Sequence, residues 1–556
     1  MKFKIYRNWK RLLCGLWVAL LATSFYVCAR SAYRASIGTE EFAYACDPFG
    51  YLRMAKQIRH AMERGGWPQF KLESTQTRTL INFMEQQNVA VPRWEEVVAP
   101  HAHHYFPKSG SVGVQYPPGT GLVLAMFPQG EAVYGLNRLV VFVFAIVGIG
   151  ALLLAIWKKA WASIGLVVLA LNLGLIVLER IGPATFSINA VLAPILLTCL
   201  FSLFALRLRH GKLALVCAFI AGLSLGFATL IRLPAFLLLP GFLILIWPGL
   251  RELRLKSLPA ALVLGVVLTG IIPVLVNQHN VAGAWYLPTY ASVDAAAPTF
   301  ERLKSNLSFF LGNGPATRDN WALLYALVGF AGFLLLCAKG GSNRLGLTWK
   351  RLALAAFSIW LISICYFLTH AITAPHYMIP PVFAAVTLLG LGALGIEATT
   401  TGGKTFHRRS VLSWVALVLI LWPGLATANR VWTNRYRGST PRSAQTRAPI
   451  LLPAELVDDK AWIWADLLTG SLWYYASKPA FKIQFTDHEV RAMLYRFVYE
   501  RGERQYLLQD SEQMKQYIAE IERMGGKFEM RGKLEGAPVL LVVWPAGGPL
   551  LTQASR

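Results

Sequence analysis

The chain has 556 residues, of which 55% are hydrophobic and only 15% are charged. Soluble domains carry about a quarter charged residues, so this composition excludes a purely soluble protein and indicates a polytopic membrane protein with some water-soluble mass. The formal net charge of +25 does not indicate nucleic acid as a partner, because the cytoplasmic loops of membrane proteins collect Lys and Arg.

The seven cysteines contain no Cys-x-x-Cys pair. The spacing therefore indicates neither a zinc site nor a disulfide framework. A bridge between Cys28 and Cys46 is the one pairing left open.

The first predicted element is a membrane helix at the N-terminus. Residues 1–11 carry five basic residues and no acid, and residues 12–29 are apolar. A signal peptide has the same order of charge and apolarity, but no small-x-small cleavage site follows. The run is also long enough to cross a bilayer, so we predict an uncleaved helix whose N-terminus is cytoplasmic.

Residues 30–117 form a predicted outer loop of mixed charge. Within it, apolar residues recur at helical spacing and predict a surface helix near 48–64. Asp47 then stands at the N-cap and Pro48 at the first helical position. Such a cap would explain Asp47 without any chemistry.

The next apolar stretch, 120–133, is short and is interrupted around Pro128 and Glu131. A complete crossing needs about 20 apolar residues, so we predict a dipping or partial helix here. Full spans are predicted over 12–29, 137–157, 161–179, 186–206, 214–231, 233–248, 258–276, 321–338, 352–369, 377–396 and 411–428.

The distribution of charge predicts the topology of these spans. Six segments, namely residues 1–11 and five short loops that connect alternate pairs of spans, together hold 20 Lys and Arg residues. They hold one acid, Glu252. This bias places them in the cytoplasm. With eleven full spans the C-terminus lies outside, and if 120–133 also crosses, one other assignment must change. The prediction is therefore about 11–13 transmembrane helices.

The composition changes near residue 430, and a second domain is predicted over 431–556. Its candidate strands are 462–465, 481–485, 505–509 and 539–543, and its candidate helices are 487–502, capped by Thr486, and 511–524, capped by Asp510. Alternating strands and helices predict a small α/β domain on the extracytoplasmic side. Residues 1–430 form the predicted transmembrane domain. No glycine-rich phosphate loop or nucleotide fingerprint occurs in the chain.

Asp47 is the strongest candidate for chemistry. A carboxylate beside an attacking hydroxyl or amine accepts its proton as the new bond forms. Glu40 and Glu41 are rival bases, since they lie close in sequence. Arg53 and Lys56 follow on the same predicted helix at i, i+3 spacing, which lets them act together on a lipid phosphate.

Several polar residues near the predicted outer ends of helices are candidates for binding. Tyr116 opens the partial helix in the string Tyr-Pro-Pro-Gly-Thr. His103 and His104 belong to a His-x-His-His cluster, a pattern that binds divalent metals. No acid lies directly beside the cluster, so phosphate or sugar contact is the preferred interpretation and a metal the alternative. The other candidates are Arg232, His376 and Tyr377.

The order of these motifs resembles the GT-C glycosyltransferases, which include the dolichyl-phosphate-mannose–protein mannosyltransferases and the bacterial aminoarabinose transferase of lipid A. That superfamily has Asp-x-x-x-Tyr-x-x-x-Ala before a surface helix, here Asp47, Tyr51 and Ala55. It often has Tyr-Pro-Pro-Gly opening the next helix, here 116–119.

Three further motifs lie in the rest of the resemblance, which covers roughly residues 10–430. Arg-x-Pro between middle helices is Arg232–Pro234 here, and a loose Asn-x-x-x-Gly segment begins at Asn280 and precedes Tyr290. Arg-Tyr-x-x-Pro opening a late helix becomes His376–Pro380. His stands there in place of Arg, and His is not reliably charged at neutral pH.

The resemblance implies a glycosyltransferase of the bacterial inner (plasma) membrane. Its donor would be a polyprenyl-phosphate sugar, and its acceptor a lipid, glycan or protein of the envelope. Asp47 would be the base, with Glu41 as the alternative, and Tyr51, Arg53, Lys56, His103, His104, Tyr116, Arg232, His376 and Tyr377 would contact substrate. No cofactor is implied, and a transporter or lipid flippase without covalent chemistry is the alternative class.

Overall fold

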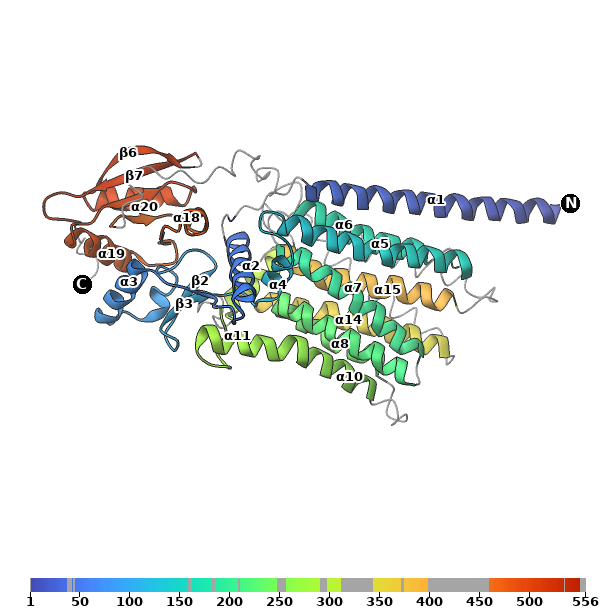
Figure 1. Ribbon diagram of the computed structural model, residues 1–556. Coiled ribbons are helices and arrows are strands. Elements are labelled where there is room, and N and C mark those ends of the chain that lie inside the picture. The colour runs from blue at the N-terminus through green and yellow to red at the C-terminus, as the bar shows by residue number, and fades with distance from the viewer. Residues whose placement is uncertain are drawn as a thin grey trace. The chain divides into compact units, whose positions relative to one another are not determined.

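The computed structural model describes residues 2–37, 43, 46–158, 160, 163–181, 186–208, 211–247, 257–290, 298–311, 344–371, 375–398, 460–534 and 536–550. The chain divides into two compact units, whose elements are labelled in Figure 1. Unit 1 comprises residues 1–39, 133–274 and 297–440, and unit 2 comprises residues 40–132, 275–296 and 441–556.

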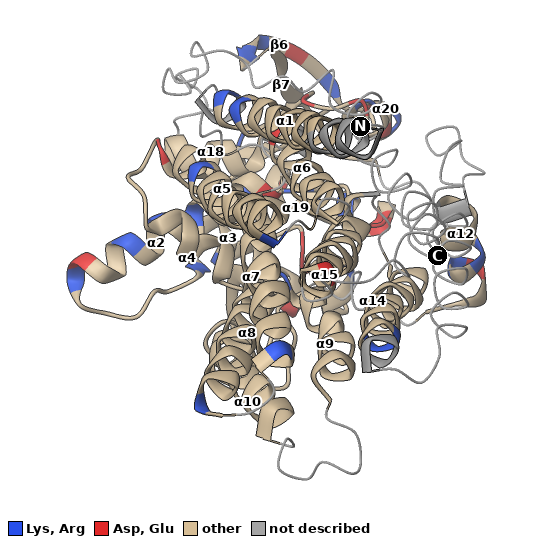
Figure 2. Ribbon diagram, turned by 90° about the vertical axis from the view of Figure 1, so that its right-hand side faces the viewer, with Lys and Arg blue, Asp and Glu red and all other residues tan. Residues whose placement is uncertain are grey.

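The regular secondary structure described in unit 1 is helical. Its helices are α1 (Lys2–Ile37), α5 (Ala132–Lys158), α6 (Ile164–Ile181), α7 (Phe186–Leu208), α8 (Lys212–Ile231), α9 (Leu239–Ile246), α10 (Ser257–Val266), α12 (Phe300–Leu311), α14 (Arg344–Thr369) and α15 (Ile379–Glu397). Most of their length carries no Lys, Arg, Asp or Glu, as the tan ribbons in Figure 2 show. Seven described helices are long and apolar enough to cross a membrane, so the chain is an integral membrane protein.

The predicted spans agree with these helices. Nine of the eleven coincide with described apolar helices, seven of them long and two, 164–179 and 233–246, shorter. The spans predicted at 321–338 and 411–428 lie outside the described residues. The stretch 120–133 contains most of α4 (Gly119–Ala125), whose seven residues rise about 10 Å, and the first two residues of α5. It is too short to cross, so the prediction of a partial helix is confirmed.

Glycines allow close packing of helices α8 and α10. A Cβ at Gly222 would run into the backbone carbonyl of Leu262, and a Cβ at Gly265 would lie 2.6 Å from the carbonyl oxygen of Phe219. Small residues at such crossings bring two backbones together, and van der Waals packing then holds apolar helices against each other inside a membrane.

Unit 2 begins with more structure than the predicted outer loop contained. Helix α2 spans Asp47–Arg64, which confirms the helix expected near 48–64. Helix α3 spans Thr75–Gln86, and β1 (Lys71–Leu72), β3 (Ser111–Val114) and β2 (His103–Phe106) form an antiparallel sheet in the order β1-β3-β2. The sequence did not predict this sheet, because its strands have two to four residues and no clear alternation.

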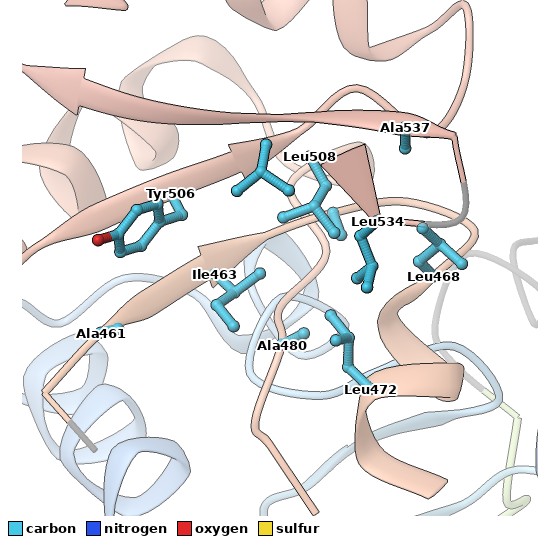
Figure 3. Close-up of a cluster of buried hydrophobic side chains, with 11 residues drawn as sticks. Ala461, Ile463, Leu468, Leu472, Ala480, Tyr506, Leu508, Leu534 and Ala537 are labelled. Carbon is cyan, nitrogen blue, oxygen red and sulfur yellow. The ribbon is translucent and has the colours of Figure 1, made fainter. Parts of the chain in front are cut away.

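The C-terminal part of unit 2 is the predicted α/β domain. Its sheet has the order β4-β5-β7-β6, with β4 (Trp462–Trp464) parallel to β5 (Gln505–Leu508) and the other pairs antiparallel. Strands β6 and β7 span Lys527–Leu534 and Ala537–Val543, and the helices are α18 (Thr469–Ala476), α19 (His488–Glu500) and α20 (Met514–Arg523). Figure 3 shows buried side chains from the strands and from α18, including Ile463, Leu472 and Leu508, gathered in one core.

Some predicted details of this domain are wrong. The candidate strand 481–485 is reduced to a single bridge between Phe481 and Trp464. Asp487, and not Thr486, caps α19 by accepting a hydrogen bond from the Val490 amide. Helix α20 has Gln513 at its N-cap, because the Asp510 carboxylate instead accepts hydrogen bonds from the amides of Asp466 and Leu468. Helix α18 and strand β6 were not among the elements predicted from the sequence.

Two buried polar contacts join the outer-loop part of unit 2 to its C-terminal part. Lys482 Nζ lies 3.1 Å from a carboxylate oxygen of Glu96, and both side chains are mostly enclosed. His101 Nε2 lies 2.9 Å from Asp466 Oδ1 in a similarly buried place. Replacing one partner of such a pair by an apolar residue leaves the other as a buried polar group without a partner. Residues 43–132 and 460–550 therefore form one body, although about 330 residues of chain separate them.

Candidate active site

Asp47 is the first residue of α2. Cys46 occupies the N-cap position and makes no side-chain cap hydrogen bond, so the prediction that Asp47 caps the helix is wrong by one residue. The Asp47 carboxylate instead accepts a hydrogen bond from the hydroxyl of Tyr116, with 2.6 Å between Oη and Oδ1. The capping explanation for this acid is therefore replaced by a tertiary contact.

Tyr116 links this carboxylate to two further side chains in what we call the Asp47 cluster, consisting of Cys46, Asp47, Gln115 and Tyr116. The sulfur of Cys46 lies 2.8 Å from Tyr116 Oη. The side-chain amide of Gln115 donates to the same sulfur at 3.8 Å. Two sequence segments about 70 residues apart thus meet around one acid.

Glycines make room for this meeting. A Cβ at Gly50 would lie 2.8 Å from the ring of Tyr116, and a Cβ at Gly121 would lie 2.7 Å from the Cβ of Met54. Real Cβ atoms do not approach so closely, so these positions of α2 and α4 accept only hydrogen. Tyr51 then stacks on the Tyr116 ring with 4.6 Å between centroids. Tyr51 therefore supports a neighbour of Asp47.

Burial keeps the neighbours of Asp47 protonated at neutral pH. Burial and the negative charge of Asp47 raise the pKa of the Cys46 thiol to about 12. The same two causes raise the pKa of Tyr116 well above its ordinary value of 10. Both groups are therefore neutral hydrogen-bond donors beside the carboxylate.

Three of the four cations of α2 lie in separate environments. Arg53 is half-buried, and burial lowers its pKa to about 10, so it stays charged. Its Nε atom is buried and has no hydrogen-bond partner among the described residues. Lys56 is exposed and lies 5.4 Å from the ring centre of Tyr474. Arg59 donates to the carbonyls of Leu124, in the last turn of α4, and of Phe127, just after that helix.

The histidines of the predicted cluster are buried and hydrogen-bonded to the protein. His104 Nε2 lies 2.8 Å from the carbonyl oxygen of Thr289, and His103 Nδ1 lies 3.1 Å from that of His101. Burial lowers the pKa of all three histidines, so they are neutral at pH 7. Across the described ranges, no group of three or more His, Cys, Asp or Glu is arranged to hold a metal ion. These contacts indicate a structural role for His104.

A second group of candidates gathers in unit 1, in what we call the Arg232 cluster, consisting of Ser187, Arg232, His376 and Tyr377. Arg232 follows α8 and donates to the Ser187 hydroxyl at 3.2 Å. Its guanidinium lies 4.8 Å from the ring centre of Tyr377, and the ring of His376 meets that of Tyr377 edge-on at 4.9 Å. The Nε atom of Arg232 is buried and has no hydrogen-bond partner within the described part of the chain. Two motifs about 140 residues apart thus form one cationic and aromatic cluster.

The predicted residues therefore fall into two sets. Those in unit 2 are Asp47, Tyr51, Arg53, Lys56, His103, His104 and Tyr116, and those in unit 1 are Arg232, His376 and Tyr377. Glu40 and the alternative base Glu41 lie outside the described residues. Sequence reasoning missed Cys46 and Gln115, although each adjoins a candidate residue in the chain.

The sequence matches no protein-family model and shows no significant match to a curated protein. It is similar to solved structures. ArnT from Cupriavidus metallidurans bound to undecaprenyl phosphate has 13% identity and a TM-score of 0.47, over 95% of this chain and 97% of that one. AglB from Archaeoglobus fulgidus, an archaeal oligosaccharyltransferase in complex with an inhibitory peptide and a dolichol-phosphate, has 11% identity and a TM-score of 0.43, over 92% and 73%.

The Archaeoglobus fulgidus oligosaccharyltransferase in its apo form has 12% identity and a TM-score of 0.44, over 96% of this chain and 75% of that one. Because the identities and TM-scores are low, the roles of individual residues follow from the geometry of this chain alone.

Proposed function

We propose that the chain is a glycosyltransferase of the bacterial inner membrane that moves a sugar from a polyprenyl phosphate to an envelope acceptor. The observation that carries the proposal is the 2.6 Å hydrogen bond between Tyr116 and Asp47. It joins two of the motifs that carry the resemblance to GT-C enzymes, and it holds an acid in a defined position. The seven described helices that are long and apolar enough to cross a membrane suit a substrate with a long apolar tail.

The proposed reaction is a single displacement at the anomeric carbon. The acceptor oxygen or nitrogen forms a bond to that carbon while the bond from the carbon to the phosphate oxygen breaks. The electron pair leaves with the polyprenyl phosphate, and Asp47 accepts the proton of the acceptor. One displacement inverts the anomeric configuration.

The leaving phosphate gains negative charge as its bond to the sugar breaks, so cations near it stabilise the transition state. Arg53 in unit 2 or Arg232 in unit 1 is suited to this role, because each has a buried Nε atom without a hydrogen-bond partner among the described residues. Lys56 is exposed and supplies a further positive charge on α2. A cation without a paired acid retains its capacity to bind an anion.

The orientation is part of the proposal. The basic loops predict a cytoplasmic N-terminus and a periplasmic or extracellular C-terminal domain, with the acceptor site on the same outer side. A reporter enzyme that works only after export should be active when it is fused after Arg556. Activity of a reporter that works only in the cytoplasm would contradict this orientation.

Direct assay tests the activity. Purified full-length protein is incubated with radiolabelled undecaprenyl-phosphate and dolichol-phosphate sugars and with extracted envelope acceptors, in parallel with and without a chelator. We expect transfer of label to one acceptor class and no effect of the chelator. Movement of a lipid-linked sugar across vesicles without transfer would instead support the flippase alternative.

The sugar and acceptor can be identified in the cell. Mass spectrometry of envelope glycans should show that a deletion strain lacks one decoration while its pool of lipid-linked sugars is otherwise unchanged. An unaltered glycan profile in that strain would contradict the proposed function.

A further inference from the structure

We propose that Tyr116, Cys46 and Gln115 form a one-directional hydrogen-bond chain that positions the Asp47 carboxylate and keeps it ionised. Only the expected effect on sugar transfer rests on the proposed function. The hydrogen-bond chain itself depends only on the four side chains. It makes Tyr116 a positioning residue, where the sequence had predicted a substrate contact.

The direction of each hydrogen bond follows from the donor inventory. An ionised carboxylate only accepts, so Tyr116 must donate its single hydroxyl proton to Asp47 Oδ1. The hydroxyl then has no further proton, so at the 2.8 Å contact the Cys46 thiol must be the donor. The sulfur in turn accepts from the amide of Gln115. Every proton in the chain points toward Asp47.

The length of the first bond indicates its strength. Hydrogen bonds from a hydroxyl to an ionised acceptor are about 2.5–2.7 Å long and roughly twice as strong as neutral ones. The observed 2.6 Å between Tyr116 and Asp47 lies in this range. Because the thiol donates to the same hydroxyl, it polarises the O–H group and strengthens it as a donor. A hydrogen bond to the charged form lowers the pKa of a carboxyl group.

The surroundings hold the chain in place. Tyr51 stacks on Tyr116, and Gly50 leaves room for the Tyr116 ring. Two further titratable groups act on these side chains: the positive charge of Lys482 favours ionisation of the Cys46 thiol, and Tyr51 adds to the causes that raise the pKa of Tyr116. Burial outweighs the effect of Lys482 and raises the pKa of Cys46 to about 12, so the thiol keeps the proton it must donate.

The test measures the titration of Asp47 without relying on sugar transfer. Full-length protein is labelled with a carbodiimide, which reacts with protonated carboxyl groups, and labelling at Asp47 is followed against pH by peptide mass spectrometry. The variants are Tyr116→Phe, which removes the donor, Cys46→Ala, which breaks the chain one step back, and Cys46→Ser, which keeps a donor and an acceptor. Thermal unfolding checks that each variant is folded.

We expect Tyr116→Phe to move the labelling midpoint upward by about one pH unit, since one unit corresponds to the loss of a single hydrogen bond to a charge. Cys46→Ala should move it upward by less, and Cys46→Ser should stay near the wild-type midpoint. In the transfer assay, Tyr116→Phe should lower kcat and leave the KM for the donor unchanged, because the hydroxyl contacts the base and not the lipid.

The outcomes separate this inference from the proposed function. An unchanged midpoint in Tyr116→Phe, or equal shifts in Cys46→Ala and Cys46→Ser, would overturn the chain even if the wild type transfers sugar. The expected shifts in a protein that transfers no sugar would support the chain and overturn the glycosyltransferase proposal. If Tyr116→Phe does not fold, the two Cys46 variants still decide the matter.

Discussion

The Asp47 cluster in unit 2 and the Arg232 cluster in unit 1 differ in kind. The first contains an acid that receives a short hydrogen bond from Tyr116. The second contains a cation that lies over the ring of Tyr377 and bonds to a neutral hydroxyl, and no carboxylate pairs with it among the described residues. An acid held in position suits proton transfer, whereas a cation without a paired acid suits anion binding. The comparison thus distinguishes the proposed base from a proposed anion-binding site.

The largest effect is expected from Asp47→Asn. Asn can still accept the hydrogen bond from Tyr116, but it cannot take a proton from the acceptor. Loss of a general base costs about a hundredfold to ten-thousandfold in rate. The variant should melt near the wild-type temperature, because Asp47 does not cap α2, and radiolabel transfer should be nearly abolished.

The matched controls are Glu40→Gln and Glu41→Gln, for which we expect milder losses. Near-normal transfer by Asp47→Asn together with an inactive Glu41→Gln variant would identify Glu41 as the base. The Asp47 cluster would then be structural, and the contrast between the two clusters would fail.

The second prediction concerns the body that carries the Asp47 cluster. Glu96→Gln leaves the buried ammonium of Lys482 without its carboxylate. Removing one partner of a buried pair destabilises a protein by about 3–5 kcal/mol. We expect a lower melting temperature of the purified protein, and partial recovery in the double variant Glu96→Gln, Lys482→Met, which removes both charges. A melting temperature unaffected by Glu96→Gln would show that this pair does not join the outer loop to the C-terminal domain.

The third prediction tests the binding role of the Arg232 cluster. Arg232→Met removes the charge but keeps much of the apolar stem, so the KM for the lipid-linked donor should rise. Hydrogen bonds to charged groups are worth about 1.5–3 kcal/mol, which corresponds to roughly tenfold or more in affinity. Steady-state kinetics with varied donor should show this rise with a smaller change in kcat, and Arg232→Lys should recover part of it. A loss confined to kcat would contradict a binding role.

The smallest effect is a pH dependence of stability that arises in unit 2. Burial raises the pKa of Asp510 to about 6, above its value in an unfolded chain. The stability that this group contributes is therefore present below about pH 4 and is lost as the pH rises through about 6. In thermal unfolding between these pH values, Asp510→Asn should remove part of the decline seen in the wild type. An identical pH profile for both proteins would exclude Asp510 as its source.

The local features of this protein could be predicted from the sequence. The membrane helices follow from runs of apolar residues, and the helix at 47–64 follows from the spacing of its apolar positions. Both are properties of contiguous residues, because the bilayer sets the length of a span and the α-helix sets the period of a face. The motifs also marked Asp47 and Tyr116 as candidates before their contact was known.

The tertiary structure decided which of these residues meet. The contact between Tyr116 and Asp47 depends on the close crossing of α2 and α4, and the thiol of Cys46 acquires a role only from that contact. Arg53, which the helical spacing paired with Lys56, is half-buried in the structure, whereas Lys56 is exposed. Burial and hydrogen-bond geometry arise from groups far apart in the chain, so no local pattern of residues specifies them.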